Sequence, residues 1–222
     1  MIETLDWSGL NLDTRQRMNG LTLLDKIEND VVPLVFFDPQ YRGVLDKLDY
    51  GNEGERQIER SEMKQMSEEI ICEFIEEISR VLQPSGHLML WVDKFILVEG
   101  VSKFLGNTDL EPVDMITWAK LTKHGKHWFG MGYRTRRSSE YLIVLQKIPK
   151  RAKGVWTDRG IRDVWEERVP EGHPHAKPIE LQKRLIEAVT NPGDVVLDPA
   201  AGGYTVMQAA FETDRHFLGC SL

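Results

Sequence analysis

The residues best suited to chemistry follow a short apolar run and form the segment Val35-Phe36-Phe37-Asp38-Pro39-Gln40-Tyr41. An apolar run of this length, bounded by Asp-Pro, is typical of a buried strand that stops abruptly. Its end would present the Asp38 carboxylate, the Pro39 carbonyl and the Tyr41 ring together. Two acceptors beside an aromatic face suit an exocyclic amine and the base that carries it. The alternative is an Asp-Pro turn that merely ends a strand.

A second segment of this kind lies near the C-terminus, Val195-Val196-Leu197-Asp198-Pro199-Ala200-Ala201-Gly202-Gly203-Tyr204-Thr205. The pattern predicts a strand, a turn of small residues and a helix. Backbone amides and a helix N-terminus can approach a ligand closely through such a turn. Tight packing would explain the small residues equally well, so this segment alone does not define a function.

Apolar patterns of strand and helix type alternate along the chain. They predict an α/β fold, a single domain over residues 1–222 with a mostly parallel sheet and helices on both faces. The expected strands are 31–37, 87–92, 113–118, 140–146, 194–197 and 216–222. The expected helices are 21–27, one that starts after Ser67 and ends at Pro84-Ser85-Gly86, 97–104, 179–189 and 204–211. Residues 1–17 show no strong period, and a linker with one short element near Val164 is expected over 148–172.

Composition narrows the class of protein. The chain has 222 residues, a net charge of −7 and two cysteines without a spacing that suggests a metal site or a disulfide framework. It has no signal-peptide core and no apolar window of membrane-spanning length. These features predict a cytoplasmic protein in a reducing compartment. The long polar stretch at 43–66 is interpreted either as a mobile flap over Asp38 or as a solvated loop.

The order of several motifs makes the pattern specific. His173-Pro174-His175-Ala176-Lys177-Pro178-Ile179-Glu180-Leu181 is followed by Asn191-Pro192-Gly193-Asp194 and then by Leu197-Asp198-Pro199. Ile116-x-Trp118-x-Lys120 and Glu140-Tyr141-x-x-Val144 precede them. From about residue 18 to its end, the chain resembles the beta-class S-adenosylmethionine-dependent amino-group DNA methyltransferases. In that family the catalytic Asp-Pro-Pro-Tyr segment also precedes the cofactor segment.

The resemblance implies a Rossmann-like sheet and a division of roles among the motifs. Asp38, Pro39 and Tyr41 would hold a flipped base, and Asp at the first position favours adenine N6. Flipping is implied because an exocyclic amine inside a duplex is out of reach of a methyl donor. The residues implied in binding S-adenosylmethionine are His173, Lys177, Pro178, Asp198, Pro199, Ala200, Gly202, Thr205 and Ser221.

Four positions depart from the family pattern. Gln40 replaces a second proline, Ala200 an aromatic residue, and Tyr204 a glycine. Ser221 stands where an acidic residue usually accepts hydrogen bonds from the ribose, which predicts a weaker contact. The final strand would also leave an open edge, so we expect another segment or a partner subunit to cover it.

Basic and aromatic residues interleave over residues 119–139, which suits phosphate contacts and base stacking. A solvated hairpin loop is the alternative. The candidate DNA-binding residues are Lys123, Lys126, Arg134, Arg136 and Arg137. The histidines of this segment have no carboxylate or cysteine at ligand spacing, so no metal site is predicted.

The resemblance implies double-stranded DNA as the partner, and it leaves open a homodimer and a restriction endonuclease partner. Three alternatives to the adenine-N6 reaction stay open. They are methylation of RNA adenine, methylation of cytosine N4 in DNA by the same fold, and a non-catalytic relative that only binds nucleic acid.

Overall fold

The computed structural model describes residues 7, 9–40, 66–130, 135–171 and 176–222. Within these ranges eight strands form one sheet in the order β1-β8-β7-β2-β3-β5-β4-β6. The strands are β1 (Gln16–Arg17), β2 (Val32–Phe37), β3 (Leu82–Val92), β4 (Leu110–Leu121), β5 (Ser139–Lys147), β6 (Val164–Arg168), β7 (Val195–Asp198) and β8 (His216–Ser221). The helices are α1 (Gly20–Leu24), α3 (Glu68–Val81), α4 (Lys94–Glu99), the 3₁₀ turn η1 (Val101–Phe104), α5 (Ile179–Val189) and α6 (Thr205–Phe211).

The sheet is mostly parallel, as the alternation of patterns predicts. β2 lies between β7 and β3 and pairs with both in parallel. Antiparallel pairing joins β5 to β3 and to β4, whereas β6, β8 and β1 are added in parallel. Because β2 and β7 run in the same direction, their Asp-Pro ends reach the same edge of the sheet.

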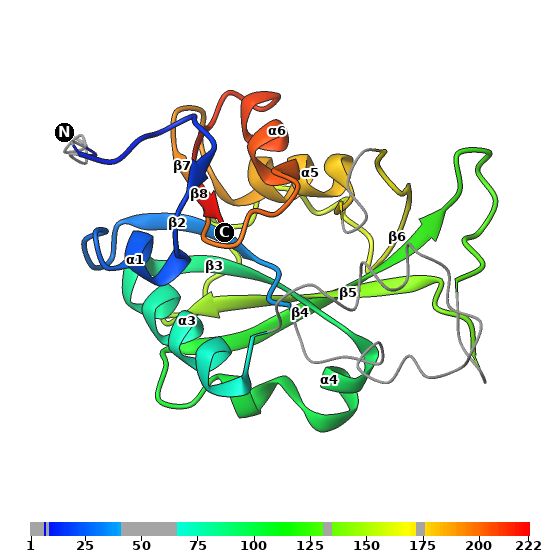
Figure 1. The fold of residues 1–222 in the computed structure, drawn as a ribbon, viewed down its shortest axis with the longest axis horizontal. Coiled ribbons are helices and arrows are strands. Elements are labelled where there is room, and N and C mark those ends of the chain that lie inside the picture. The colour runs from blue at the N-terminus through cyan, green and yellow to red at the C-terminus, as the bar shows by residue number, and fades with distance from the viewer. Residues whose placement is uncertain (1–6, 8, 41–65, 131–134, 172–175) are drawn as a thin grey trace.

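Helices cover both faces of the sheet (Figure 1). One buried cluster joins α1 and α3 to the sheet and includes Phe37 and Phe74, whose ring centroids lie 5.1 Å apart. The other cluster joins α5 and α6 to the opposite face and includes Phe36 and Leu185. Successive side chains of a strand point to opposite faces. Phe36 and Phe37 therefore enter different clusters, and every residue of β2 is buried.

Helix α3 begins where the sequence predicts but ends earlier. The Ser67 hydroxyl accepts a hydrogen bond from the backbone N–H of Ile70. The helix ends at Val81, so the prediction that Pro84-Ser85-Gly86 ends it is wrong. Those residues lie within β3, where the pairing with β2 shifts register. Proline lacks a ladder donor and Ser85 has a φ of 66°, and both features suit a bulge.

A local cap and a glycine explain the shifted boundaries of the helix expected at 97–104. Asp93 accepts hydrogen bonds from the backbone N–H groups of Phe95 and Ile96, at 2.8 and 3.0 Å. Helix α4 therefore starts before the expected helix at 97–104. Gly100, with a φ of 94°, separates α4 from η1. The short element expected near Val164 is β6, which pairs with β4.

The N-terminal segment, for which the sequence shows no strong period, closes one edge of the sheet. β1 pairs with β8, and Gln16 lies opposite Cys220. The Asp13 carboxylate accepts a hydrogen bond from the backbone N–H of Phe217 at 2.8 Å and contacts His216 Nδ1 at 2.7 Å. Another segment of the same chain thus pairs with the edge of β8, which is one of the two expected ways of covering it.

The predicted flap at 43–66 lies outside the described residues except for Met66. The backbone N–H of Met66 donates to the Gln40 carbonyl at 2.9 Å, so the described ends of this segment meet two residues after Asp38.

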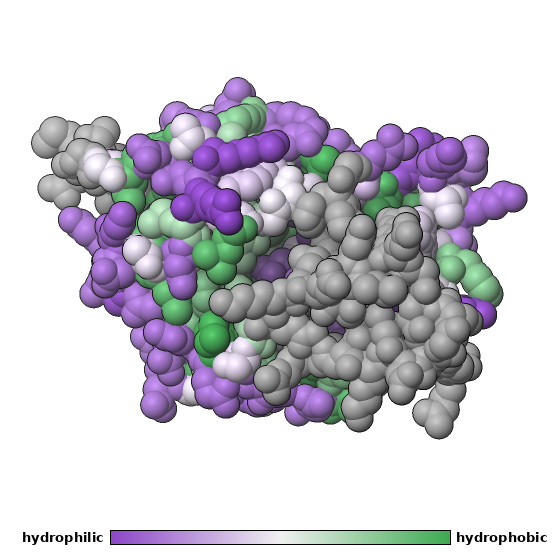
Figure 2. All heavy atoms as spheres, in the orientation of Figure 1, coloured by the Kyte–Doolittle hydropathy of each residue, from purple (hydrophilic) through white to green (hydrophobic). Residues whose placement is uncertain are grey.

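No helix of the described ranges is long and apolar enough to cross a membrane. The described residues on the face shown in Figure 2 are mostly hydrophilic.

Candidate active site

Strand β2 brings Asp38 and Pro39 to the carboxyl edge of the sheet. The strand itself is buried, whereas the Asp38 side chain is 35% exposed. Pro39 is buried, and Tyr41, the third predicted catalytic residue, lies outside the described residues. The structure thus presents a half-buried carboxylate at a strand end, the place where ligands bind in open α/β sheets.

Strand β7 brings Asp198 to the same edge. Two pairs of residues join β7 to β2, and the second pair lies one residue before Asp198 and three before Asp38. Asp198 is 5% exposed, and its carboxylate accepts a hydrogen bond from the Ala200 N–H at 3.1 Å. A Cβ atom at Gly219 of β8 would lie only 2.4 Å from the Asp198 carbonyl oxygen. Glycine at that position allows β8 to approach the turn closely.

Lys177 lies beside Asp38 and links it to further charges. Its Nζ lies 2.7 Å from Asp38 Oδ2, 3.0 Å from Glu140 Oε2 and 5.3 Å from the centre of the Trp91 ring. Glu140 also forms an ion pair with Lys120. Two carboxylates and two ammonium groups therefore form a continuous row that starts at Asp38.

The charges in this row determine which members are ionised. Burial alone would lower the pKa of Lys177, but Asp38 and Glu140 raise it above its ordinary value. Burial alone would raise the pKa of Glu140, but Lys177 and Lys120 hold it well below its usual range. Burial does raise the pKa of Asp38; Lys177 opposes the shift and Glu140 adds to it. Lys177 and Glu140 therefore stay charged. The pKa of Asp38 is shifted toward the neutral form, so Asp38 is the member of the row whose protonation can change.

A carboxylate from β6 fixes the start of α5 and hence the position of Lys177. Pro178, the N-cap residue of α5, makes no side-chain hydrogen bond to the helix. The Glu167 carboxylate instead accepts hydrogen bonds from the backbone N–H groups of Glu180 and Leu181, at 2.9 and 3.0 Å. A negative charge at this end also interacts favourably with the helix dipole.

A cavity of about 70 Å³ lies between the two strand ends. It brings together Asp38 and most of the predicted cofactor-binding residues that the structure describes. Those on its wall are Lys177, Asp198, Ala200, Gly202 and Thr205. Burial raises the pKa of Asp198 to about 7; the Ala200 amide and Lys177 oppose this shift, and the Asp38 charge adds to it.

The other predicted cofactor-binding residues lie around this cavity or outside the described ranges. Pro178 caps α5, and the Pro199 carbonyl lies 3.6 Å from Cys220 Sγ. The Ser221 carbonyl accepts a hydrogen bond from the Met18 N–H at 3.2 Å. His173 is not among the described residues.

The prediction from sequence missed three residues of this site: Trp91, Glu140 as a partner of Lys177, and Gln182. Gln182 lines the cavity and is fully buried. A signal for it exists in the sequence, because it precedes Leu185 and Ile186 by three and four residues and so shares their inner helix face. Trp91 lies in an apolar run that could equally be core, and nothing local indicates its contact with Lys177.

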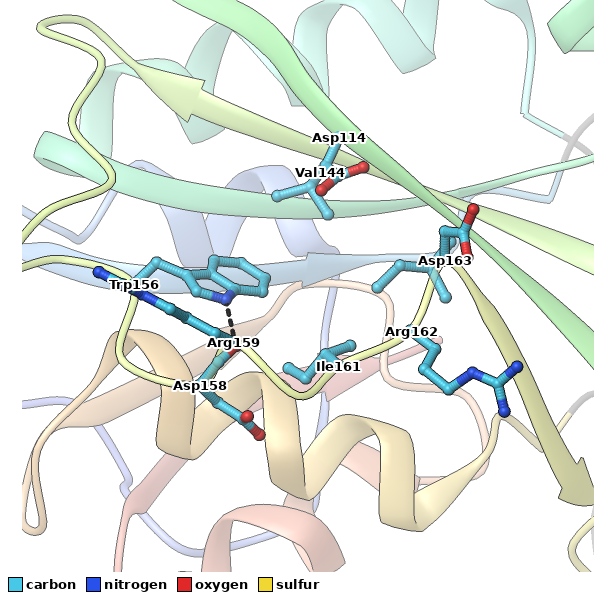
Figure 3. Close-up of a pocket in the computed structure, with 9 residues that line it drawn as sticks. Asp114, Val144, Trp156, Asp158, Arg159, Ile161, Arg162 and Asp163 are labelled. Carbon is cyan, nitrogen blue, oxygen red and sulfur yellow. Dashed lines mark hydrogen bonds between the residues drawn. The ribbon is translucent and has the colours of Figure 1, made fainter.

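A larger hollow of about 210 Å³ lies near the beginning of β4 (Figure 3) and shares no lining residue with the cavity between the strand ends. Asp114 and Val144 of the sheet form one wall, and the loop with Trp156 and Ile161 forms the other. Trp156 Nε1 donates to the Asp158 carbonyl at 2.6 Å within this loop. No described member of the predicted site lines this hollow.

Comparison with known proteins decides the family. The model of N6 and N4 methyltransferases, described as DNA methylase, matches residues 32–222. The type II methyltransferase M.HhaII of Haemophilus parahaemolyticus is 54% identical over 214 residues, which cover 95% of this chain and 91% of that protein. The chain belongs to the N6/N4 DNA methylase family. It is an S-adenosylmethionine-dependent DNA methyltransferase.

Solved structures share the fold of this methylase. The cytosine-N4-specific PvuII DNA methyltransferase matches with a TM-score of 0.68 and 13% identity, over 96% of this chain and 83% of that chain. A putative DNA modification methylase from Thermus thermophilus, complexed with S-adenosyl-L-methionine, matches with a TM-score of 0.65 and 22% identity, over 94% and 87%. These matches confirm the predicted methyltransferase sheet.

In this methylase the predicted DNA-binding residues lie around the connection from β4 to β5. Lys123 and Lys126 are exposed just after β4, and the Arg136 guanidinium lies 4.9 Å from the centre of the Phe129 ring. Arg137 is less free, because its guanidinium lies 3.6 Å from Asp93 Oδ2. Arg134 is outside the described residues. Since β4 runs parallel to β2, this connection follows the same edge of the sheet as Asp38.

Proposed function

We propose that this methylase transfers a methyl group from S-adenosylmethionine to N6 of an adenine held at Asp38 in duplex DNA. The main support for this proposal is the position of the Asp38 carboxylate. It follows β2 and lies on the wall of the cavity that Lys177 and Asp198 also line. A carboxylate accepts the hydrogens that an exocyclic amine donates. The resemblance of Asp38-Pro39-Gln40-Tyr41 to the family's catalytic segment supports adenine over cytosine.

The described residues fit the cofactor. S-adenosylmethionine carries a carboxylate, an ammonium and a sulfonium group, and the cavity offers a cation in Lys177, a carboxylate in Asp198 and the amide of Gln182. Gly202 and Gly203 leave space on the side of the turn. When bound, the cofactor supplies the electrophilic methyl group. We propose that it is held by His173, Lys177, Pro178, Asp198, Pro199, Ala200, Gly202, Thr205 and Ser221.

In the proposed reaction Asp38 and the Pro39 carbonyl accept hydrogen bonds from the two N–H groups of the amine, and Tyr41 stacks on the base. These contacts turn the nitrogen lone pair toward the methyl donor, so that positioning and electrostatics supply the rate. The new N–C bond would form as the bond between the methyl carbon and the sulfonium sulfur breaks, which leaves S-adenosylhomocysteine, and the nitrogen loses one proton. Asp38 is suited to accept that proton, because burial raises its pKa.

Lys177 competes with the amine for one oxygen of Asp38. Its ammonium lies 2.7 Å from Asp38 Oδ2, where an N–H group of the target amine would otherwise donate a hydrogen bond. Glu140 lies 3.0 Å away on the other side and is itself held by Lys120. If Lys177 moves away from Asp38, it therefore keeps Glu140 as its ion-pair partner. In this proposal Glu140 and Lys120 are positioning residues for Lys177.

DNA approaches this edge of the sheet in the proposal, and the target base is flipped out of the duplex. Lys123, Lys126, Arg134, Arg136 and Arg137 contact its backbone. A homodimer and a restriction endonuclease partner stay predictions from the family resemblance.

The test is transfer of a labelled methyl group from S-adenosylmethionine to unmethylated DNA, followed by nucleoside analysis. Label in N6-methyldeoxyadenosine is expected. Asp38→Ala should lower the rate by about 100-fold or more, with a melting temperature close to that of the unaltered protein. Asp114→Ala, at an exposed aspartate of β4, serves as the control. Label in N4-methyldeoxycytidine would contradict the adenine assignment, and full activity of Asp38→Ala would remove Asp38 from the mechanism.

A further inference from the structure

Helix α5 places an unpaired amide against the cavity between the strand ends. Gln182 is fully buried and lines this cavity. Neither its Nε2 nor its Oε1 has a hydrogen-bond partner within the described part of the chain. Most buried side-chain polar atoms in native proteins do have a partner, and one without a partner calls for an explanation. A donor and an acceptor without a partner, on a residue of the cavity wall, point to a ligand.

The neighbouring groups indicate the chemistry of that ligand. Lys177 is the one cation among the described residues on the cavity wall, and Asp198 adds a carboxylate. Together with an amide that both donates and accepts, this set matches an α-amino acid group. A carboxylate can accept from Lys177 and from Gln182 Nε2. An ammonium can donate to Gln182 Oε1 and to Asp198.

The position of Gln182 favours the cofactor over the target base. The wall that includes Gln182 also includes Ala201, Thr205 and Val206, from the turn after β7 and from α6. Both belong to the cofactor segment, whereas the base is proposed to bind at Asp38. At about 70 Å³ the cavity takes only a small part of a molecule the size of S-adenosylmethionine. An amino-acid group is a part of suitable size.

We propose that Gln182 binds the amino-acid end of S-adenosylmethionine through its side-chain amide. This assignment rests on the proposed function, since it places the cofactor in the same cavity. Gln182 and Lys177 lie on either side of the α5 N-terminus, which the Glu167 carboxylate fixes. The same cap therefore fixes the positions of both side chains relative to the cavity. This role adds a cofactor-binding residue to those that the motifs indicate.

The test compares Gln182→Met with the unaltered protein by calorimetric titration of S-adenosylhomocysteine. Methionine keeps the length of the side chain and removes both polar atoms. The dissociation constant for S-adenosylhomocysteine should rise about 10-fold or more, because a hydrogen bond to a charged group is lost. 5′-Methylthioadenosine lacks the amino-acid end, and its affinity, measured by competition, should not change.

The melting temperature of the ligand-free variant gives a second readout. It should stay the same or rise, since the substitution removes a buried unpaired amide. Gln208→Met is the matched control, because Gln208 is exposed on α6 and bonds Glu212. Unchanged affinity of Gln182→Met for S-adenosylhomocysteine would overturn the proposal. So would an equal loss for both compounds, because it would give Gln182 a structural role.

Discussion

Single residues of the site differ in how their charge is balanced. Asp38 and Asp198 end adjacent strands and lie on one cavity wall. Asp38 forms an ion pair with Lys177, whereas Asp198 forms none within the described ranges and accepts a hydrogen bond from the Ala200 amide. Burial therefore dominates at Asp198 and raises its pKa to about 7. Near neutral pH this carboxyl can respond to a bound cation.

Asp198→Asn should stabilise the ligand-free protein at about pH 8. The ordinary pKa of the group is 3.8 and the folded-state pKa is about 7, so folding favours the protonated form. Its contribution to stability is fully present below about pH 4, falls as the pH rises to about 7, and is lost above that. The change amounts to at most about 4 kcal/mol. Asparagine is neutral throughout, so the variant should melt above the unaltered protein at pH 8 and close to it at pH 4.

Melting curves between about pH 4 and pH 8 would measure this difference, with Asp163→Asn as an exposed control. If the difference in melting temperature between Asp198→Asn and the unaltered protein is the same at every pH, Asp198 does not titrate in this window. If this difference disappears when S-adenosylmethionine is added at pH 8, the positive charge of the cofactor lies beside Asp198.

At the scale of elements, periodicity locates the helices and strands, and caps decide where they begin. The apolar spacing predicts α5 over residues 179–189, and the structure has the same bounds. Ser67 is recognised as a cap from its sequence alone, because acidic residues and an apolar face follow it. Pro84-Ser85-Gly86 has the composition of a turn, yet it forms a bulge, because the choice depends on the neighbouring strand β2.

Contacts between distant segments explain what the sequence did not predict. Glu167 can cap α5 only after β6 has paired with β4, and local sequence carries no sign of that docking. The same holds for Glu140, which reaches Lys177 only once β5 has joined the sheet. Asp38 and Asp198 were predictable as neighbours, because parallel strand ends meet at one edge.

The connection between β4 and β5 supports a prediction about DNA. Replacing Lys123, Lys126 and Arg136 with alanine should weaken DNA binding. It should also lower the slope of log K against log salt, by up to about 0.9 for each phosphate that is no longer neutralised. Arg137 is left in place because it contacts Asp93, which caps α4. The affinity for S-adenosylhomocysteine should not change.

Titration of a fluorescent duplex at several salt concentrations would measure the slope. The control triple replaces Lys153, Arg159 and Arg162, which are exposed in the segment before β6. Equal slopes for the two triple variants would place the DNA on another surface.

At the scale of the whole molecule, the N-terminal segment contacts the turn between β7 and α6. The Tyr204 hydroxyl donates to the Gln16 carbonyl at 2.8 Å, and Arg15 lies 5.2 Å from the centre of its ring. Tyr204 has a φ of 57°, a left-handed conformation that glycine, the residue of the family pattern at this position, can adopt without strain. The tyrosine side chain ties the turn to the N-terminal segment. The carbonyl of Ser221, another departure from the family pattern, pairs with Met18 of this segment.

Asp13→Ala should loosen this support. The Asp13 backbone and carboxylate exchange hydrogen bonds with the backbone of Phe217, at 2.8 Å each, and the carboxylate also contacts His216. Losing the carboxylate should lower the free energy of unfolding by about 1–3 kcal/mol. It should also weaken S-adenosylhomocysteine binding, because β8 packs directly against the turn after Asp198. Asp13→Asn, which keeps one acceptor for Phe217, should recover most of both losses.

Denaturant unfolding and calorimetric titration would measure the two effects, and Asp214→Ala provides the matched control. Asp13 and Asp214 have φ values of 60° and 58°, so alanine meets the same backbone strain at either position. Asp214 is exposed and lies on the loop before β8, but its side chain does not bond the strand in the described structure. A larger loss at Asp13 measures the attachment of the N-terminal segment to β8. Equal losses would show that backbone strain alone is responsible and that cofactor binding does not depend on this attachment.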